Sequence, residues 1–203
     1  MREEKLIFTN KTKLKILHKF LHLLDSKKRK ITIEYQGKEL NTLYGLQKDA
    51  KGLKLKFREM MKLLIKGTIQ IPIFHMVENL DGIGVKNKIY RMFGAKIGKE
   101  VYIAPGVYMD EMLPELIEIG DGTIIGKDSS LLTHEFTVKH ASFGRIKIGK
   151  QVTVGAQSII KCGIKIGDGA VVAMDSLVNK DVPKKEIVGG IPAKKIKKLK
   201  NII

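Results

Sequence analysis

Written in sixes, residues 148–183 read IGKQVT, VGAQSI, IKCGIK, IGDGAV, VAMDSL and VNKDVP. The first position of every hexad is aliphatic, and the fifth is small or β-branched. The same spacing occurs earlier in the chain, where the first positions are Ile97, Ile103, Met109, Ile119, Ile125 and Leu131. A short period sustained over so many hexads indicates a repeat architecture, in which each unit buries its apolar side only by stacking on its neighbours.

A period of six fits neither an α-helix nor the simple alternation of a long strand. It predicts a short strand followed by a corner, with three hexads forming one triangular coil and with parallel pairing between stacked coils. The Gly-Asp-Gly triplets at 120–122 and 167–169 are typical of such tight corners. The sequence therefore predicts a mainly β fold built on a hexapeptide-repeat coil over residues 95–183.

The flanks of the coil have a different pattern. Amphipathic helices are predicted over 11–25, 53–66 and 85–93, and a hairpin over 31–35 and 39–43. Pro72 is expected to break the apolar run 69–77. Residues 1–94 thus form an N-terminal region of helices and a hairpin, whose helices are expected to cover the open end of the coil. Residues 184–203 form a short basic tail.

The charge of the chain is concentrated outside the coil. The net charge is +17, and residues 95–183 carry 10 basic against 11 acidic side chains, so the flanks hold the excess. Nucleic acid is not expected as a partner, because aromatic residues are only 6% and no recognised nucleic-acid-binding motif is present. Basic amphipathic helices can lie on membranes, but packing within the protein or on another subunit is favoured here.

Two features bear on localisation. Cys162 is the single cysteine, which excludes a disulfide framework and suits a reducing compartment. The start, MREEKLIF, has no secretory pattern, and no apolar stretch approaches the length of a membrane span. We therefore expect a cytoplasmic protein.

The hexads and the end of the coil resemble the hexapeptide-repeat acyltransferases, in particular their maltose and galactoside O-acetyltransferase-like branch. Residues 176–183 read SLVNKDVP, where the family commonly has S-x-V-T-K-D-V-P, and residues 188–193 read VGGIPA, where it has V-G-G-N-P-A. The resemblance covers about residues 85–200. It implies a left-handed parallel β-helix, a homotrimer, and direct transfer of an acetyl group from acetyl-CoA to a small-molecule or glycan acceptor, with no metal required.

The resemblance also implies a general base at the mouth of an extruded loop. The hexads fail after Leu131, so residues 137–147 are predicted to leave the coil, and His134 lies where the loop starts. An alcohol must lose its proton as it attacks a thioester, and an unperturbed imidazole titrates near ~6.5. Glu135 and Asp110 are candidates to orient the ring. Asp110 also lies where relatives bind the acceptor, and His140 is expected to line the acceptor pocket.

A set of residues is carried over by position to the binding of coenzyme A. Lysine ammonium groups suit its phosphates. The residues are Ala156 and Met174 for the slot, Lys180, Lys194 and Lys197 for the phosphates, and Asn179, which replaces the family's threonine.

Two other functions remain open from the sequence. A metalloenzyme like the gamma-class carbonic anhydrases would need three histidines, and the coil region offers His134 and His140, to which His75 or a carboxylate would have to be added. A non-catalytic hexapeptide scaffold is the second. The acceptor also stays open: a sugar, a nucleotide-linked or lipid-linked saccharide, or an amino group.

Overall fold

The structure is a computed structural model that describes residues 3–8, 30–35, 66–80, 84–137 and 140–199. The predicted helix at 11–25 and the predicted strand at 39–43 lie outside these ranges. The predicted helix at 53–66 lies outside them except for its last residue.

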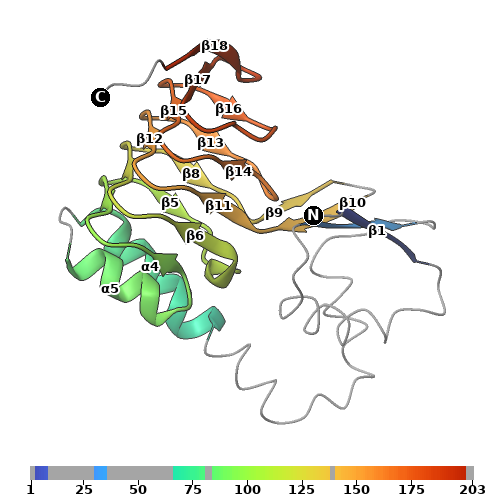
Figure 1. Cartoon of the computed structure of the whole chain (residues 1–203). Coiled ribbons are helices and arrows are strands. Elements are labelled where there is room, and N and C mark those ends of the chain that lie inside the picture. The colour runs from blue at the N-terminus through green and yellow to red at the C-terminus, as the bar shows by residue number, and fades with distance from the viewer. Residues whose placement is uncertain (1–2, 9–29, 36–65, 81–83, 138–139, 200–203) are drawn as a thin grey trace.

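The described strands form three mainly parallel sheets and a fourth, lateral sheet (Figure 1). Sheet I contains β3 (Lys96–Ile97), β6 (Ile117–Ile119), β11 (Ile146–Ile148) and β14 (Lys165–Ile166). Sheet II contains β4 (Tyr102–Ile103), β7 (Ile124–Ile125), β12 (Thr153–Val154), β15 (Val171–Val172), β17 (Glu186–Gly189) and β18 (Lys194–Lys198). Sheet III contains β5 (Tyr108–Met109), β8 (Ser130–Leu131), β13 (Ile159–Ile160) and β16 (Leu177–Val178).

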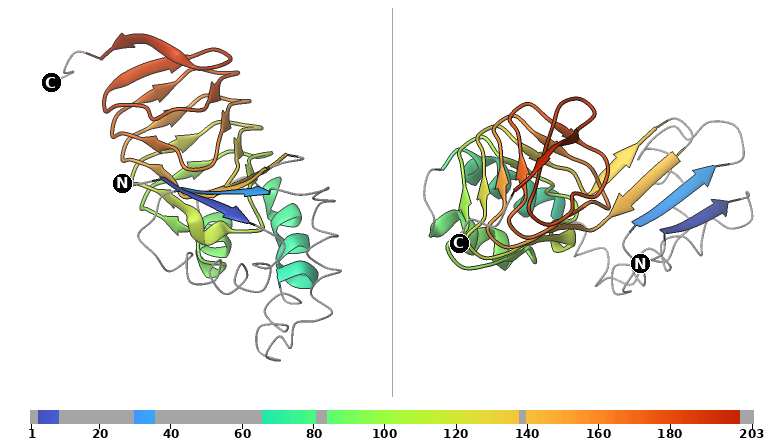
Figure 2. Two further views of the ribbon diagram at one scale, coloured as in Figure 1. Left: turned by 90° about the vertical axis from the view of Figure 1, so that its right-hand side faces the viewer. Right: turned by 45° about the horizontal axis from the view of Figure 1, so that its top comes forward.

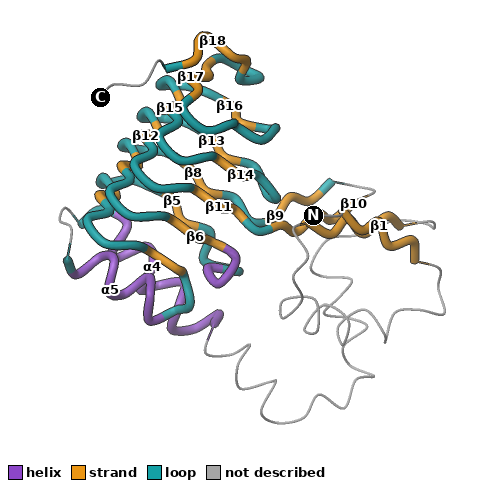
Figure 3. Tube along the Cα trace, viewed as in Figure 1, coloured by secondary structure: helices purple, strands orange, loops and turns teal. Residues whose placement is uncertain are grey.

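The chain visits sheets I, II and III in turn, so each passage through all three lies on the previous one (Figure 3). The pairing register aligns the first position of each hexad with the same position one coil away, as in Met109↔Leu131 and Ile160↔Val178. Every predicted first position is buried, with Ile97 the most exposed at 8%. Because strand residues alternate between faces, the residue before each of them points outward. The predicted burial of the first hexad positions is confirmed.

The corners require a left-handed backbone. Gly122 and Gly169, the last residues of the two Gly-Asp-Gly triplets, both have φ of 64°. Residues with a side chain adopt the same conformation at other corners, including Glu100, Gln151 and Lys185. The glycine triplets were therefore a correct but partial signal of where the chain turns.

Two helices cover the first coil (Figures 1 and 2). Helix α5 (Val85–Met92) confirms the predicted helix at 85–93, and α4 (Ile71–Glu78) follows a π-helical turn, η2 (Lys66–Gln70). Phe74, Val77 and Tyr90 belong to the same buried core as the coil. The prediction that Pro72 breaks the apolar run is wrong, because proline is tolerated in the first turn of a helix, where its missing N–H is not needed.

Polar contacts also attach these helices to the first coil. The Asn87 side chain donates to Val101 O (2.7 Å), and Lys86 Nζ donates to Ala104 O (2.8 Å).

Within the described ranges, no helix has both the length and the apolar composition needed to cross a bilayer.

The fourth sheet, here called the arm sheet, projects from the side of the coil (Figure 2). Its order is β1 (Glu3–Phe8), β2 (Lys30–Tyr35), β10 (His140–Gly144) and β9 (His134–Phe136). The predicted extruded loop is thus largely a β-hairpin, since β9 and β10 are antiparallel and β11 begins already at Ile146. A strand was correctly predicted at 31–35, but its two neighbours in the sheet are β1 and β10.

Candidate active site

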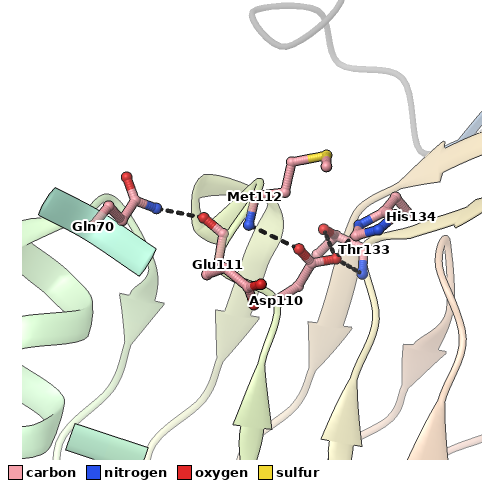
Figure 4. A network of polar contacts seen from close by, with 6 residues as sticks. All are labelled: Gln70, Asp110, Glu111, Met112, Thr133 and His134. Atoms are coloured by element: carbon pink, nitrogen blue, oxygen red, sulfur yellow. Dashed lines mark hydrogen bonds and ion pairs between the residues drawn. The ribbon is translucent and has the colours of Figure 1, made fainter. Parts of the chain in front are cut away.

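Asp110 lies at the corner that follows β5, where it is completely buried. Its Oδ1 accepts a hydrogen bond from Met112 N (3.0 Å), and its Oδ2 accepts from Thr133 N (2.8 Å) and Thr133 Oγ1 (2.6 Å) (Figure 4). The register Met109↔Leu131 explains this contact, because it places the corner after β5 directly against the corner after β8. The carboxylate is therefore fixed by its surroundings before any substrate binds.

His134 completes this set of contacts from the first residue of β9. Its Nδ1 lies 2.6 Å from Asp110 Oδ2, and its side chain is 21% exposed. A carboxylate can only accept hydrogen bonds, so Nδ1 carries the hydrogen, and in the neutral ring Nε2 keeps a lone pair. Nε2 makes no hydrogen bond to any residue that the structure describes. In the neutral ring, this arrangement leaves Nε2 available to accept a proton.

The protonation of the pair follows from its burial and its hydrogen bonds. Burial would raise the pKa of the Asp110 carboxyl, but the hydrogen bonds from His134 and Thr133 outweigh it and hold this pKa below its ordinary value. The hydrogen bond to Asp110 raises the pKa of His134 above its ordinary value, although partial burial opposes it. The negative charges of Asp110 and Glu111 act in the same upward direction.

Glu135, the other predicted orienting residue, contacts a different partner. Its Oε1 accepts a hydrogen bond from Lys161 Nζ (2.9 Å). Successive side chains of a strand point to opposite faces, so Glu135 lies on the face of β9 away from the His134 ring. Of the two carboxylates predicted to orient the ring, Asp110 makes the contact with His134 and Glu135 does not. His140 lies in β10, and its side chain is outside the described part of the chain.

The predicted coenzyme residues fall on separate parts of the coil. Ala156 and Met174 occupy successive corners between sheets II and III, where Asp175 N donates to Ala156 O (2.9 Å). Met174 is 73% exposed there. Asn179 and Lys180 are exposed and follow β16, at a corner between sheets III and I. His134 and Lys161 lie at the corresponding corners after β8 and β13. Lys194 and Lys197 are exposed on β18.

Several residues around the pair were not identified from the sequence. Thr133 supplies two of the donors to Asp110, and Gln70, from the N-terminal region, donates to Glu111 O (2.6 Å) beside it (Figure 4). Phe136 and Phe143 lie close to the His134 ring. Alternation along 134–136 could have indicated Phe136, whereas Gln70 has no local signal.

Among the described residues, no group of three or more His, Cys, Asp or Glu side chains is arranged to hold a metal ion.

Comparison with known proteins gives the following matches. The family model for the hexapeptide repeat of succinyl-transferase matches residues 145–180. The "Putative acetyltransferase YvoF" of Bacillus subtilis is 46% identical over 111 residues, which are 54% of this chain and 64% of that protein. The "Putative acetyltransferase SAS0727" of Staphylococcus aureus is 33% identical over 139 residues, 68% of this chain and 82% of that protein. The chain spans less than two thirds of the length of the Bacillus relative.

Two solved structures share the fold. A hexapeptide-repeat-containing acetyltransferase from Vibrio cholerae, complexed with acetyl coenzyme A, superposes with a TM-score of 0.54 at 23% identity, covering 65% of this chain and 86% of that chain. A maltose O-acetyltransferase from Clostridium difficile has a TM-score of 0.56 at 21% identity, covering 68% and 89%.

Proposed function

Because the chain belongs to the hexapeptide-repeat acyltransferase family, we propose that it transfers an acetyl group from acetyl-CoA to a hydroxyl group of a saccharide-type acceptor, with His134 as the general base. The observation that carries the proposal is the 2.6 Å contact between His134 Nδ1 and a fully buried Asp110 carboxylate. Acetyl-CoA as donor is supported by the Vibrio structure, and a saccharide acceptor by the maltose enzyme that shares the fold.

In the proposed reaction, the hydroxyl oxygen of the acceptor attacks the thioester carbonyl carbon of acetyl-CoA. At the same time, Nε2 of His134 accepts the proton of that hydroxyl group. Asp110 keeps the ring in the Nδ1–H tautomer and stabilises the imidazolium that forms. When the tetrahedral intermediate collapses, the carbon–sulfur bond breaks and the ester is released. The imidazolium then returns the proton to the thiolate of coenzyme A, so the histidine is neutral again.

We propose that Lys180, Lys194 and Lys197 meet the phosphates of the donor, with Asn179 beside them, and that Ala156 and Met174 line its pantetheine arm. All three ammonium groups are on exposed residues, so they can reach an anionic ligand without first losing a buried partner. We also propose that the coil winds with a left hand. The chain is proposed to divide into an N-terminal region (1–94), the coil (95–183) and a basic tail (184–203).

A homotrimer is proposed from the outward residues of the three sheets. Sheet I presents charged side chains, namely Lys96, Glu118, Lys147 and Lys165. Sheets II and III present Ile124 and Ile159, which are 45% and 40% exposed, together with Tyr102, Tyr108, Val171 and Leu177. Exposed apolar surface of this kind marks interfaces, so we propose that copies of the chain pack through sheets II and III.

The oligomer is tested by charge insertion. The double variant Ile124→Lys with Ile159→Lys should shift the molecular mass in multi-angle light scattering from trimer to monomer. Lys96→Glu, on the charged sheet, is the matched control and should remain trimeric. A wild-type monomer at micromolar concentration would contradict the proposal.

The chemistry is tested with His134→Ala, using acetyl-CoA, a panel of saccharide acceptors and a reagent that detects free thiol. Removing a general base should lower turnover by roughly 10²–10⁴-fold. The dissociation constant of acetyl-CoA, measured by calorimetry, should stay within about twofold of wild type. The reason is that a general base acts on the transition state and does not contribute to donor binding. Equal turnover of wild type and variant would overturn the assignment of the base.

A further inference from the structure

Three aromatic rings gather on one face of the hairpin formed by β9 and β10, beside the candidate site. His134 and Phe136 lie on the same face of β9, and their ring centroids are 5.0 Å apart. Phe143 is paired with His134 across the hairpin, with centroids 6.5 Å apart, and packs edge-on against Phe136 at 5.6 Å. The imidazole thus stands beside two phenyl rings from neighbouring strands.

These phenyl rings lie outside the buried core of the coil. Neither Phe136 nor Phe143 belongs to the buried core cluster, and Phe136 is 40% exposed. Strand β9 is also the edge of the arm sheet. A large apolar ring held at an exposed edge beside a reactive imidazole has the position of a ligand contact, since binding pockets combine aromatic walls with a few polar groups.

The charges around the rings favour an uncharged ligand. Asp110 and Glu111 are the acidic groups that act on the His134 ring. Lys161, a nearby cation, is paired with Glu135 on the other face of β9. A carboxylate or phosphate placed over the aromatic face would be repelled by these two acidic side chains, while the charge of Lys161 is offset by Glu135.

We propose that Phe136 and Phe143 form the acceptor platform and that the acceptor is a neutral, ring-shaped molecule whose apolar face packs on them while its hydroxyl reaches Nε2 of His134. The face of an aromatic ring carries negative potential, so the polarised C–H groups of a pyranose or the edge of an aromatic ring pack well against it. This inference rests on the proposed function and adds the chemical class of its acceptor. Phe136 becomes a specificity-determining residue.

The test compares para-nitrophenyl β-D-glucopyranoside, a neutral probe, with para-nitrophenyl β-D-glucuronide, which adds one negative charge. Wild type should use the neutral probe with at least about tenfold higher kcat/KM. Phe136→Ala should raise the KM for the neutral probe about tenfold, the scale of a lost aromatic contact. Phe136→Tyr should restore it, and the KM for acetyl-CoA should not change. Met92→Ala, at an exposed apolar residue on α5, is the matched control and should leave both KM values unchanged.

An unchanged KM in Phe136→Ala, or equal use of the two probes, would overturn the inference while leaving the transferase intact. If wild type acetylates neither probe, binding of the neutral glycoside is measured by saturation-transfer NMR. Binding that is lost in Phe136→Ala would then support the platform even though the proposed acetyl transfer had failed. Absence of binding to wild type would overturn the platform.

Discussion

Replacing Asp110 by asparagine changes one terminal atom at the centre of the candidate site. Thr133 N, Thr133 Oγ1 and His134 Nδ1 all converge on Oδ2, whereas Met112 N alone reaches Oδ1. The amide oxygen of the variant should therefore take the Oδ2 position, where it satisfies three donors. The amide nitrogen then faces Met112 N, and the His134 tautomer is preserved. What the variant loses is the negative charge.

The size of the effect follows from that charge. Two unit charges about 4 Å apart attract by about 4 kcal/mol at an effective dielectric constant of about 20. If the imidazolium of the transition state loses this attraction, kcat should fall by about 10³-fold. The two facing N–H groups should also lower the free energy of unfolding by about 1–3 kcal/mol, because a buried donor loses its acceptor.

Steady-state kinetics with acetyl-CoA across a range of pH provide the measurement. In the wild type, His134 must be neutral to act, and Asp110 raises its pKa, so activity should fall on the acid side of that raised pKa. In Asp110→Asn the pKa of His134 drops, so the acid limb should move to lower pH. Thr133→Val, which removes one hydroxyl donor and leaves the carboxylate, should cost no more than about tenfold. Asp110→Asn turnover within a few-fold of wild type, or an unmoved acid limb, would refute the reasoning.

Three further outcomes are expected. Glu135→Gln should keep turnover within about threefold of wild type, because its partner is a partly exposed lysine and such pairs contribute little; a loss matching that of His134→Ala would move the orienting role to Glu135. Combined Lys180→Ala and Lys194→Ala should raise the KM for acetyl-CoA more than it lowers kcat, as expected of ground-state phosphate contacts, and an unchanged coenzyme affinity would remove both from the site. Ile160→Ala, at a fully buried first position, should destabilise the fold by about 2–5 kcal/mol in urea unfolding, whereas a change below about 1 kcal/mol would contradict the stacking.

The arm sheet shows the limit of local patterns. Alternation identified a strand at 31–35, but its partner β10 lies more than 100 residues further along the chain, at His140–Gly144. Period-two alternation states which residues share a face and carries no information on which distant segment supplies the hydrogen bonds. For the same reason, the hairpin character of 134–144 was missed, although the point at which the chain leaves the coil was predicted.

The sequence by itself determined the coil, because its period repeats the same local choice at every hexad and burial then follows from stacking. The break in the hexads after Leu131 also marked the segment in which His134 lies, and the family resemblance then predicted this residue as the base. Only the tertiary structure decided which carboxylate serves that histidine. Glu135 is adjacent in sequence but is turned to the opposite face of β9, whereas Asp110, 24 residues away, is brought within 2.6 Å. The physical reason is the pairing of β5 with β8, which sets one corner against the next.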